Sequence, residues 1–187
     1  MKTIFALLAA LMLTACQPSV QFLNRDITGA AFKSDLTLTT FDGQPLQLNQ
    51  SNPQLTLMFF GFTTCPDVCP TTLGHMKKVM TQLGDDAAKV RVVFVTLDPE
   101  RDSAQVMREY MGAFDSSFIG ARADLATTTE LAKGYQVTFE KIGNPAMYML
   151  KHSANTYIID TAGKTRVSIP YNTDASSIVH DVRQLLK

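Results

Sequence analysis

The chain has 187 residues, a formal net charge of zero at pH 7, and 45% hydrophobic against 18% charged residues. This length can form one domain with a sizeable core, and the hydrophobic content excludes a largely disordered chain. The balanced charge gives no indication of a nucleic-acid partner, because such partners require a basic surface.

The first fifteen residues have the pattern of a secretory signal peptide. Lys2 precedes an apolar run over residues 4–13, and small residues then lead to Cys16. The run is too short to span a bilayer as a stable helix. The Leu-Thr-Ala-Cys stretch that ends at Cys16 resembles a bacterial lipobox, in which the cysteine is lipidated and becomes the mature N-terminus. An ordinary signal peptide followed by a chance cysteine is the alternative interpretation.

This N-terminus predicts a membrane-anchored lipoprotein of the bacterial cell envelope, with its domain outside the cytoplasm in the periplasm. We expect residues 1–15 to be removed and residues 16–34, which lack clear periodicity, to form a lipidated tether. Residues 35–187 are then expected to form one domain. No later apolar stretch reaches membrane-spanning length, so attachment would rest on the lipid alone.

The first half of the domain alternates strand and helix patterns. Residues 36–41 alternate as a strand, Asp42-Gly43 is a hairpin signal, and residues 45–48 return. Residues 55–61 form a continuous apolar run of strand length, as expected of a buried parallel strand, and residues 90–97 form a second one. Between these two runs, apolar residues at helical spacing predict a helix: Leu73, Met76, Met80 and Leu83.

The second half begins with another predicted helix, whose apolar face consists of Val106, Met107, Tyr110, Met111 and Phe114. A short strand near residues 118–119 and a helix over 125–133, capped by Asp124, follow. Residues 135–139 alternate, and three further strands are expected, at residues 146–150, 156–160 and 165–169. Asp174 is placed to cap a final helix.

Two strand–helix units followed by a hairpin and a closing helix predict an α/β domain with a central mixed sheet flanked by helices. This order fits a thioredoxin-like domain with an added N-terminal β-hairpin. Ligand sites in such sheets lie at the carboxyl ends of the strands. Cys65 follows the 55–61 strand directly, so the predicted site and the predicted fold agree.

Cys65 and Cys69 lie four residues apart at the start of the first helix. If this segment is helical, the two side chains face the same way, with Cα atoms about 6 Å apart. That separation permits a disulfide or two thiolates on one metal ion. Pro70 is expected at the first helical position, which places both sulfurs near the positive end of the helix dipole and favours thiolates. A plain stabilising disulfide is the alternative, although so short a loop constrains the unfolded chain little.

Each of the three histidines could be a third ligand. His180 lies off the apolar stripe of the final helix, which indicates a surface position. His75 lies beside the stripe of the first helix, where a surface role is favoured and a ligand role is open. His152 precedes the 156–160 strand, and in a thioredoxin-like fold the loop entering that strand faces the cysteine turn. Spacing alone leaves the role of His152 open.

Three blocks of the sequence resemble the Sco/SenC family of copper proteins. The first is residues 59–71 around the two cysteines, the second is residues 95–102, and the third is His152-Ser153 followed by residues 157–160. The resemblance implies a thioredoxin-like fold and copper, as Cu(I) or Cu(II), bound by Cys65, Cys69 and His152. It also implies delivery of copper or reducing equivalents to the dinuclear copper site of cytochrome c oxidase, with subunit II as the partner.

The chemistry of these residue types agrees with copper. Thiolates favour Cu(I), and an added imidazole nitrogen makes Cu(II) acceptable, whereas zinc with a bound water is the chemical competitor. Asp98 is expected to approach the site as a supporting carboxylate. Met147 and Met149 are expected to fill the core rather than to bind copper.

The alternative function is a thiol–disulfide oxidoreductase with Cys65 and Cys69 as its catalytic pair. Thioredoxin-type enzymes have two residues between the cysteines and a cis-proline in the facing loop. Here three residues intervene, and the loop that begins at His152 has no proline before the next strand. This difference favours a metal site. A peroxidase-like function is least favoured, because no arginine pattern surrounds Cys65.

Overall fold

The computed structural model describes residues 20–33, 35–50, 55–144 and 147–187. Its centre is an eight-stranded sheet with the strand order β1-β10-β9-β4-β5-β6-β2-β3. Strands β4, β5 and β6 are parallel, whereas the pairs on either side of them are antiparallel. The strands of this sheet are β1 (Arg25–Asp26), β2 (Thr37–Thr40), β3 (Pro45–Gln47), β4 (Leu55–Gly61), β5 (Val90–Thr96), β6 (Ile119–Arg122), β9 (Thr156–Ile159) and β10 (Thr165–Ile169). The predicted mixed sheet and its N-terminal hairpin, β2–β3, are confirmed.

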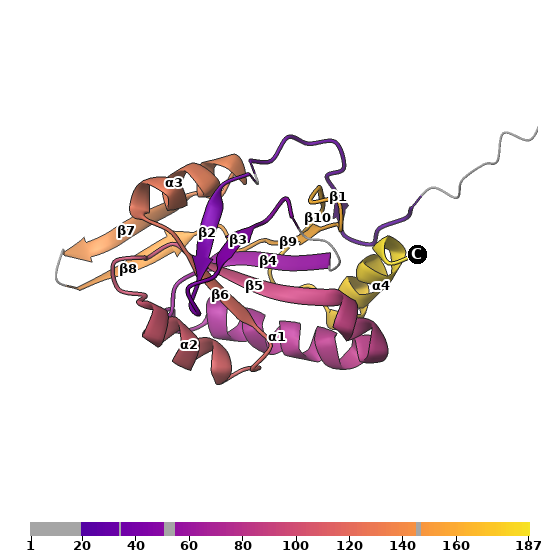
Figure 1. Cartoon of the computed structure of the whole chain (residues 1–187), viewed down its shortest axis with the longest axis horizontal. Helices are drawn as coiled ribbons and strands as arrows, with labels where there is room; N and C mark the ends of the chain where they lie inside the picture. Colours follow the sequence, from indigo (N-terminus) through magenta and orange to yellow (C-terminus); the bar gives the residue numbers. More distant parts are fainter. Residues whose placement is uncertain (1–19, 34, 51–54, 145–146) are drawn as a thin grey trace, which may run out of the picture.

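Helices cover both faces of this sheet (Figure 1). The helices are α1 (Val68–Leu83), α2 (Ala104–Gly112), α3 (Leu125–Gly134) and α4 (Ala175–Leu185), with a 3₁₀ turn, η1 (Gly84–Lys89), after α1. Alternate residues of β4 face opposite cores: Leu57 packs with residues of α1, α2 and α4, and Met58 packs with residues of α3. Burial on both faces explains why β4 and β5 are continuous apolar runs.

Local signals place most element ends correctly. The side chains of Asp124 and Asp174 accept hydrogen bonds from the backbone N–H groups of Thr127 and Ser177, so both predicted caps are confirmed. Helix α1 begins at Val68, two residues before the predicted start at Pro70. Proline is tolerated there because the first four N–H groups of a helix have no intrahelical partner.

A second, two-stranded sheet contains β7 (Phe139–Asn144) and β8 (Met147–His152), which project from one end of the central sheet (Figure 1). Strand β7 begins where the alternating 135–139 segment was predicted to end. Before it, Tyr135 ends α3 and the Val137 N–H donates to the Ala132 carbonyl, so this segment wraps around the helix end instead of forming a strand.

The described part of the predicted tether, residues 20–33, lies against the domain. Strand β1 pairs with β10, and the backbone N–H groups of Leu23 and Asn24 donate to the buried carboxylate of Asp181 at 2.7 and 2.9 Å. The ring of Phe32 lies 5.1 Å from that of Tyr135. This part of the predicted tether therefore packs on the domain. Residues 1–19, with the predicted signal peptide and Cys16, lie outside the described residues.

Candidate metal centre

The cysteine loop connects the carboxyl end of β4 to α1. Cys65 lies in the loop and is half-buried, whereas Cys69 is the second residue of α1 and is 1% exposed. The Cys69 N–H lies 3.5 Å from Cys65 Sγ, and neither cysteine is in a disulfide. Gly61 makes room for this arrangement, because a Cβ there would lie 2.8 Å from Cys69 Sγ. The sulfurs therefore lie at the strand end that the sequence predicts.

His152 is the last residue of β8 and reaches the same place from the opposite side. Its Nε2 lies 3.9 Å from Cys69 Sγ, and its Nδ1 lies 2.8 Å from the carbonyl oxygen of Ser153. A carbonyl can only accept, so Nδ1 carries the proton and Nε2 has a free lone pair. The rings of Phe62 and His152 pack edge to face, with 5.8 Å between their centres. Burial lowers the pKa of His152, which favours the neutral form that binds metals.

The burial of Cys69 favours the thiol, contrary to the thiolate expected from the helix dipole. Burial raises the pKa of this thiol well above its usual range. The dipole is a modest effect, and excluding water from a sulfur anion outweighs it. Cys69 Sγ lies 3.9 Å from His152 Nε2, and a metal ion bound by this sulfur would have to displace the thiol proton.

This difference in burial predicts unequal reactivity. In the reduced, metal-free chain at pH 7, Cys65 is expected to react with iodoacetamide at least about tenfold faster than Cys69, because thiolate fraction and access both limit the reaction. Mass spectrometry of the two labelled positions gives both rates. Since its pKa is raised, Cys69 should keep gaining reactivity as the pH rises above 9. Equal labelling rates of Cys65 and Cys69 in the folded chain at pH 7 would contradict this account. The control is the chain unfolded in guanidinium, in which the two rates should match.

The three predicted ligands are neighbours but are not yet arranged around one ion. Cys69 lies beside both Cys65 and His152. Even so, within the part of the chain that the structure describes, no group of three or more His, Cys, Asp or Glu side chains has the geometry to hold a metal ion. Ligation by all three would therefore require small side-chain movements from these positions.

The other two histidines lie elsewhere. His180 on α4 contacts the Asp181 carboxylate through Nδ1 at 3.0 Å. His75 on α1 lines a narrow hollow together with Tyr171. The exposed positions of Met147 (78%) and Met149 (42%) overturn the expectation that they fill the core. They lie on the face of β8 opposite to His152, because side chains alternate along a strand.

Asp98 contacts the element that carries His152 rather than a proposed ligand itself. It is 1% exposed, and its carboxylate accepts a hydrogen bond from Tyr148 Oη at 2.8 Å and pairs with Arg101 Nε at 2.5 Å. Asp98 therefore contacts the β7–β8 hairpin that carries His152. The sequence analysis did not identify Tyr148 or Arg101. A signal for Tyr148 was available, since it alternates with Leu150 and His152 and so shares their face of β8.

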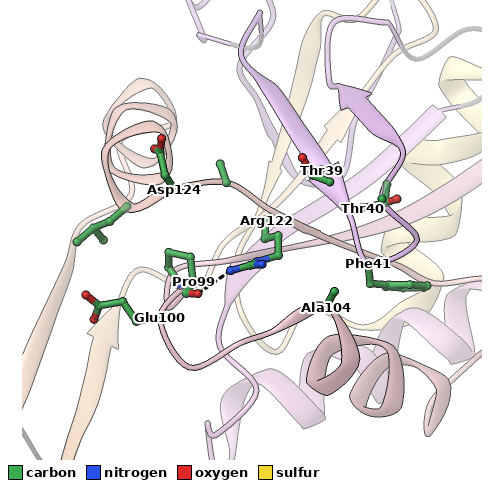
Figure 2. A pocket seen from close by; sticks show the side chains of 11 residues that line it. Thr39, Thr40, Phe41, Pro99, Glu100, Ala104, Arg122 and Asp124 are labelled. Atoms are coloured by element: carbon green, nitrogen blue, oxygen red, sulfur yellow. Dashed lines mark hydrogen bonds between the residues drawn. The ribbon is translucent and has the colours of Figure 1, made fainter.

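Two cavities lie near this end of the molecule. One, of about 580 Å³, is lined by Thr138, Glu140 and Lys151 together with His152, and it opens the imidazole to solvent. The other, of about 590 Å³, lies between β2, the segment after β5 and the start of α3, and Arg122 donates there to the Pro99 carbonyl (Figure 2). None of the predicted ligands lines this second cavity.

No described helix is long and apolar enough to cross a membrane.

Several known proteins have a similar sequence and the same fold. An SCO2-like protein of Rickettsia felis is 33% identical over 133 residues, which are 70% of this chain but only 65% of that one. Copper-bound ScoI of Bradyrhizobium japonicum superposes with a TM-score of 0.73 at 30% identity, covering 84% of this chain and 98% of that chain. Apo Sco1 of Thermus thermophilus superposes with a TM-score of 0.77 at 31% identity, covering 88% and 97%. These structures confirm the predicted thioredoxin-like fold.

The match extends over nearly all of the domain. The sequence profile described as SCO1/SenC covers residues 24–187, which include both cysteines, His152 and all of β1. The chain matches less than two-thirds of the length of the Rickettsia relative. With the fold, the position of the cysteine loop and the profile in agreement, the chain belongs to the SCO1/SenC family.

Proposed function

We propose that this chain is a copper metallochaperone that holds one copper ion, as Cu(I) or Cu(II), between Cys65, Cys69 and His152. The observation that carries the proposal is the 3.9 Å approach of His152 Nε2 to Cys69 Sγ, with Cys65 Sγ 3.5 Å from the backbone nitrogen of Cys69. Cys69 Sγ and His152 Nε2 are two of the atoms that a bound metal ion would join. Copper would be the cargo of this site rather than a resident cofactor.

The donor set fits copper. Two sulfurs select a soft ion such as Cu(I), and the neutral imidazole supplies the nitrogen that Cu(II) prefers. The Nδ1–H···O=C bond to Ser153 fixes the tautomer that leaves Nε2 free, as is usual for metal-binding histidines. The ScoI structure of Bradyrhizobium japonicum, 30% identical to this chain, has copper bound, which supports the same cargo here.

We extend the proposal to the recipient and the location. The recipient would be the dinuclear copper site of cytochrome c oxidase subunit II, the partner that the family resemblance implies. A lipid on Cys16 would hold the domain at the membrane outside the cytoplasm, where such a recipient could be reached. Residues from Phe22 onward pack on the domain, so the lipid would lie close to it in sequence.

The second candidate function is thiol–disulfide exchange, which the unequal exposure of two adjacent free cysteines favours. The Cys65 thiolate would attack a partner disulfide and form a mixed disulfide. Cys69 would then give up its proton and attack Cys65, so that the partner leaves as a dithiol with two electrons and two protons and the pair becomes a disulfide. This function needs neither copper nor His152.

Competition between copper and zinc tests the proposed cargo. We expect the reduced chain, offered equal amounts of both metals, to retain about one copper ion and little zinc. Elemental analysis after gel filtration measures both. Cys69→Ser should lose the copper, while the matched histidine variants His75→Ala and His180→Ala should keep it. Retention of zinc in preference to copper, or copper binding that survives Cys69→Ser, would contradict the proposal.

A further inference from the structure

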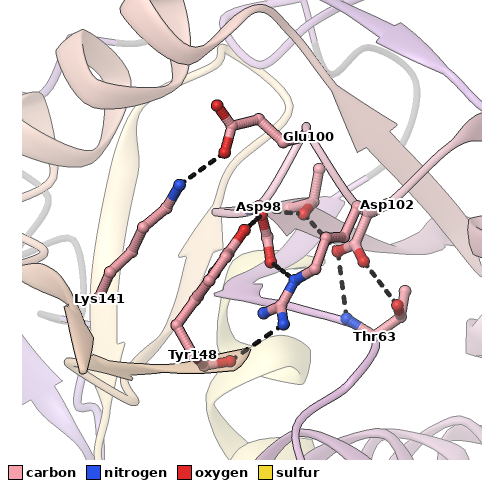
Figure 3. Close-up of polar contacts among 8 residues, drawn as sticks. Thr63, Asp98, Glu100, Asp102, Lys141 and Tyr148 are labelled. Carbon is pink, nitrogen blue, oxygen red and sulfur yellow. Dashed lines mark hydrogen bonds and ion pairs between the residues drawn. The ribbon is translucent and has the colours of Figure 1, made fainter. Parts of the chain in front are cut away.

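Residues 98–102, here called the bridge, contact both halves of the candidate metal centre. The bridge follows β5 and lies between the cysteine loop and the β7–β8 hairpin (Figure 3). Asp102, at its C-terminal end, binds the cysteine loop, whereas Asp98, Glu100 and Arg101 bind the hairpin. One short segment therefore connects the two elements that carry the proposed ligands.

The hairpin needs such an attachment. In the described chain, β7 and β8 pair with each other and with no strand of the central sheet. No backbone ladder therefore fixes the position of His152 relative to the central sheet. Tyr148 and Leu150 share the face of β8 that carries His152. Leu150 is buried in the core, and Phe139 and Tyr148 pack against the same cluster, but apolar contacts are not directional and do not alone fix an orientation.

Tyr148 supplies the directional contacts. Its Oη donates to Asp98 Oδ1 at 2.8 Å, its carbonyl accepts from Arg101 Nη1 at 3.0 Å, and the Arg101 guanidinium lies 3.8 Å from the centre of its ring. Arg101 and Asp98 are themselves paired. At the edge of this cluster, Lys141 of β7 pairs with Glu100 at 2.5 Å (Figure 3). These contacts hold the hairpin against the bridge in one orientation.

Asp102 holds the cysteine loop in the same way. It is fully buried, and its carboxylate accepts hydrogen bonds from the Thr63 N–H at 3.1 Å and from the hydroxyls of Thr63 and Thr96 at 2.5 Å each. Thr63 lies two residues before Cys65. The bridge therefore relates the position of Cys65 to that of His152. Its side chains do so without touching the sulfur of Cys65 or the imidazole of His152.

We propose that the bridge sets the distance between His152 and the two cysteines, and that Tyr148 is the positioning residue through which it determines the affinity for Cu(II). The inference rests on the proposed copper site and adds a control on valence preference. Cu(II) depends on the imidazole nitrogen, whereas two thiolates suffice for Cu(I). Loosening the hairpin should therefore weaken Cu(II) selectively.

Tyr148→Phe is the sharpest test, because it removes only the hydroxyl that binds Asp98 and leaves the ring beneath Arg101. In the reduced full chain, kept anaerobic, we expect Cu(II) affinity to fall about tenfold, the lower end of the cost of losing a residue that directly orients a metal ligand, because Tyr148 acts through the hairpin. Cu(I) affinity should stay unchanged. The sulfur-to-Cu(II) charge-transfer band should shift and the nitrogen hyperfine splitting in the electron paramagnetic resonance spectrum should weaken. Tyr171→Phe makes the same chemical change outside the bridge and should leave all three readouts as in wild type.

A second variant covers the case in which Tyr148→Phe misfolds. Arg101→Gln loosens the bridge from its other side and should give the same selective loss of Cu(II). Because both variants break one cluster, the double variant should lose less Cu(II) affinity than the two single losses combined. If both variants fold and give wild-type Cu(II) spectra, the proposed role of the bridge is wrong, while the proposed copper site is unaffected. Failure of the proposed function would look different. The wild-type chain itself would then lack the sulfur-to-Cu(II) band and the nitrogen splitting that Cys65, Cys69 and His152 should produce.

Discussion

Oxidation of Cys65 and Cys69 to a disulfide is expected to abolish stoichiometric Cu(I) binding. The reduced chain should take up about one Cu(I), because two thiolates are the minimum set for that ion. A disulfide sulfur is not a thiolate ligand, and His152 alone is a poor site for Cu(I). The expected change is therefore from about one bound ion to almost none.

The measurement is a Cu(I) titration against a chromophoric competitor, before and after oxidation. Cys16→Ser should be present in every sample, so that the third cysteine neither binds copper nor forms disulfides. The affinity of the reduced chain should also fall as the pH is lowered. The raised pKa of Cys69 means that each bound ion displaces a proton, which costs about tenfold in apparent affinity per pH unit per proton released. Equal uptake by reduced and oxidised chain would exclude the cysteine pair as ligands.

Replacing His152 by alanine is expected to weaken Cu(II) binding by more than about 100-fold, beyond the range for a residue that only supports a ligand. Cu(I) should be affected far less, since the two thiolates can hold it as a near-linear pair. The ratio of the two effects is the informative quantity. A general loss of folding would lower both affinities together, and the thermal unfolding midpoint measured in parallel would reveal it.

His180→Ala is the matched control, because His180 is also partly exposed but contacts Asp181 on α4. It should leave both affinities as in wild type. Isothermal or competitive titration with each valence gives the four constants needed. Similar losses of Cu(I) and Cu(II) affinity in a folded His152→Ala chain would contradict a valence-specific role for the imidazole.

Local patterns predicted the fold well because they report local physics. The apolar run 55–61 coincides with β4, and residues 165–169 coincide with β10. In each case the burial of the strand is visible in the sequence as a continuous or alternating run of apolar residues. The caps at Asp124 and Asp174 depend on one side chain and an N–H three residues later, so they too can be read from the sequence.

What the sequence could not predict depends on contacts between distant residues. Whether Met149 or Tyr148 faces the domain is decided by the hydrogen bond between Tyr148 and Asp98, fifty residues apart. The protonation of Cys69 depends on how completely the fold excludes water, which outweighs the helix dipole. Strand β1 spans two residues and is too short to show a period.

The candidate site divides in the same way. The spacing of Cys65 and Cys69 predicted two neighbouring sulfurs, and these lie together at the end of β4. For His152, spacing left the role open and the family resemblance proposed it. Its approach to Cys69 through Nε2 appears only in three dimensions. Alternation with His152 places Tyr148 on the same face of β8, but its contact with Asp98 and that of Asp102 with Thr63 depend on residues far apart in the sequence.

The most direct test of the central claim, that Cys65, Cys69 and His152 form one copper site, is a paired measurement on wild type and His152→Ala. It records the visible spectrum of the Cu(II)-loaded chain and the rate at which the reduced chain reduces a model disulfide. A copper site predicts that His152→Ala loses the sulfur-to-copper charge-transfer band while disulfide reduction continues at a similar rate. A variant that keeps its Cu(II) spectrum but loses disulfide reduction would contradict the copper site and favour the oxidoreductase.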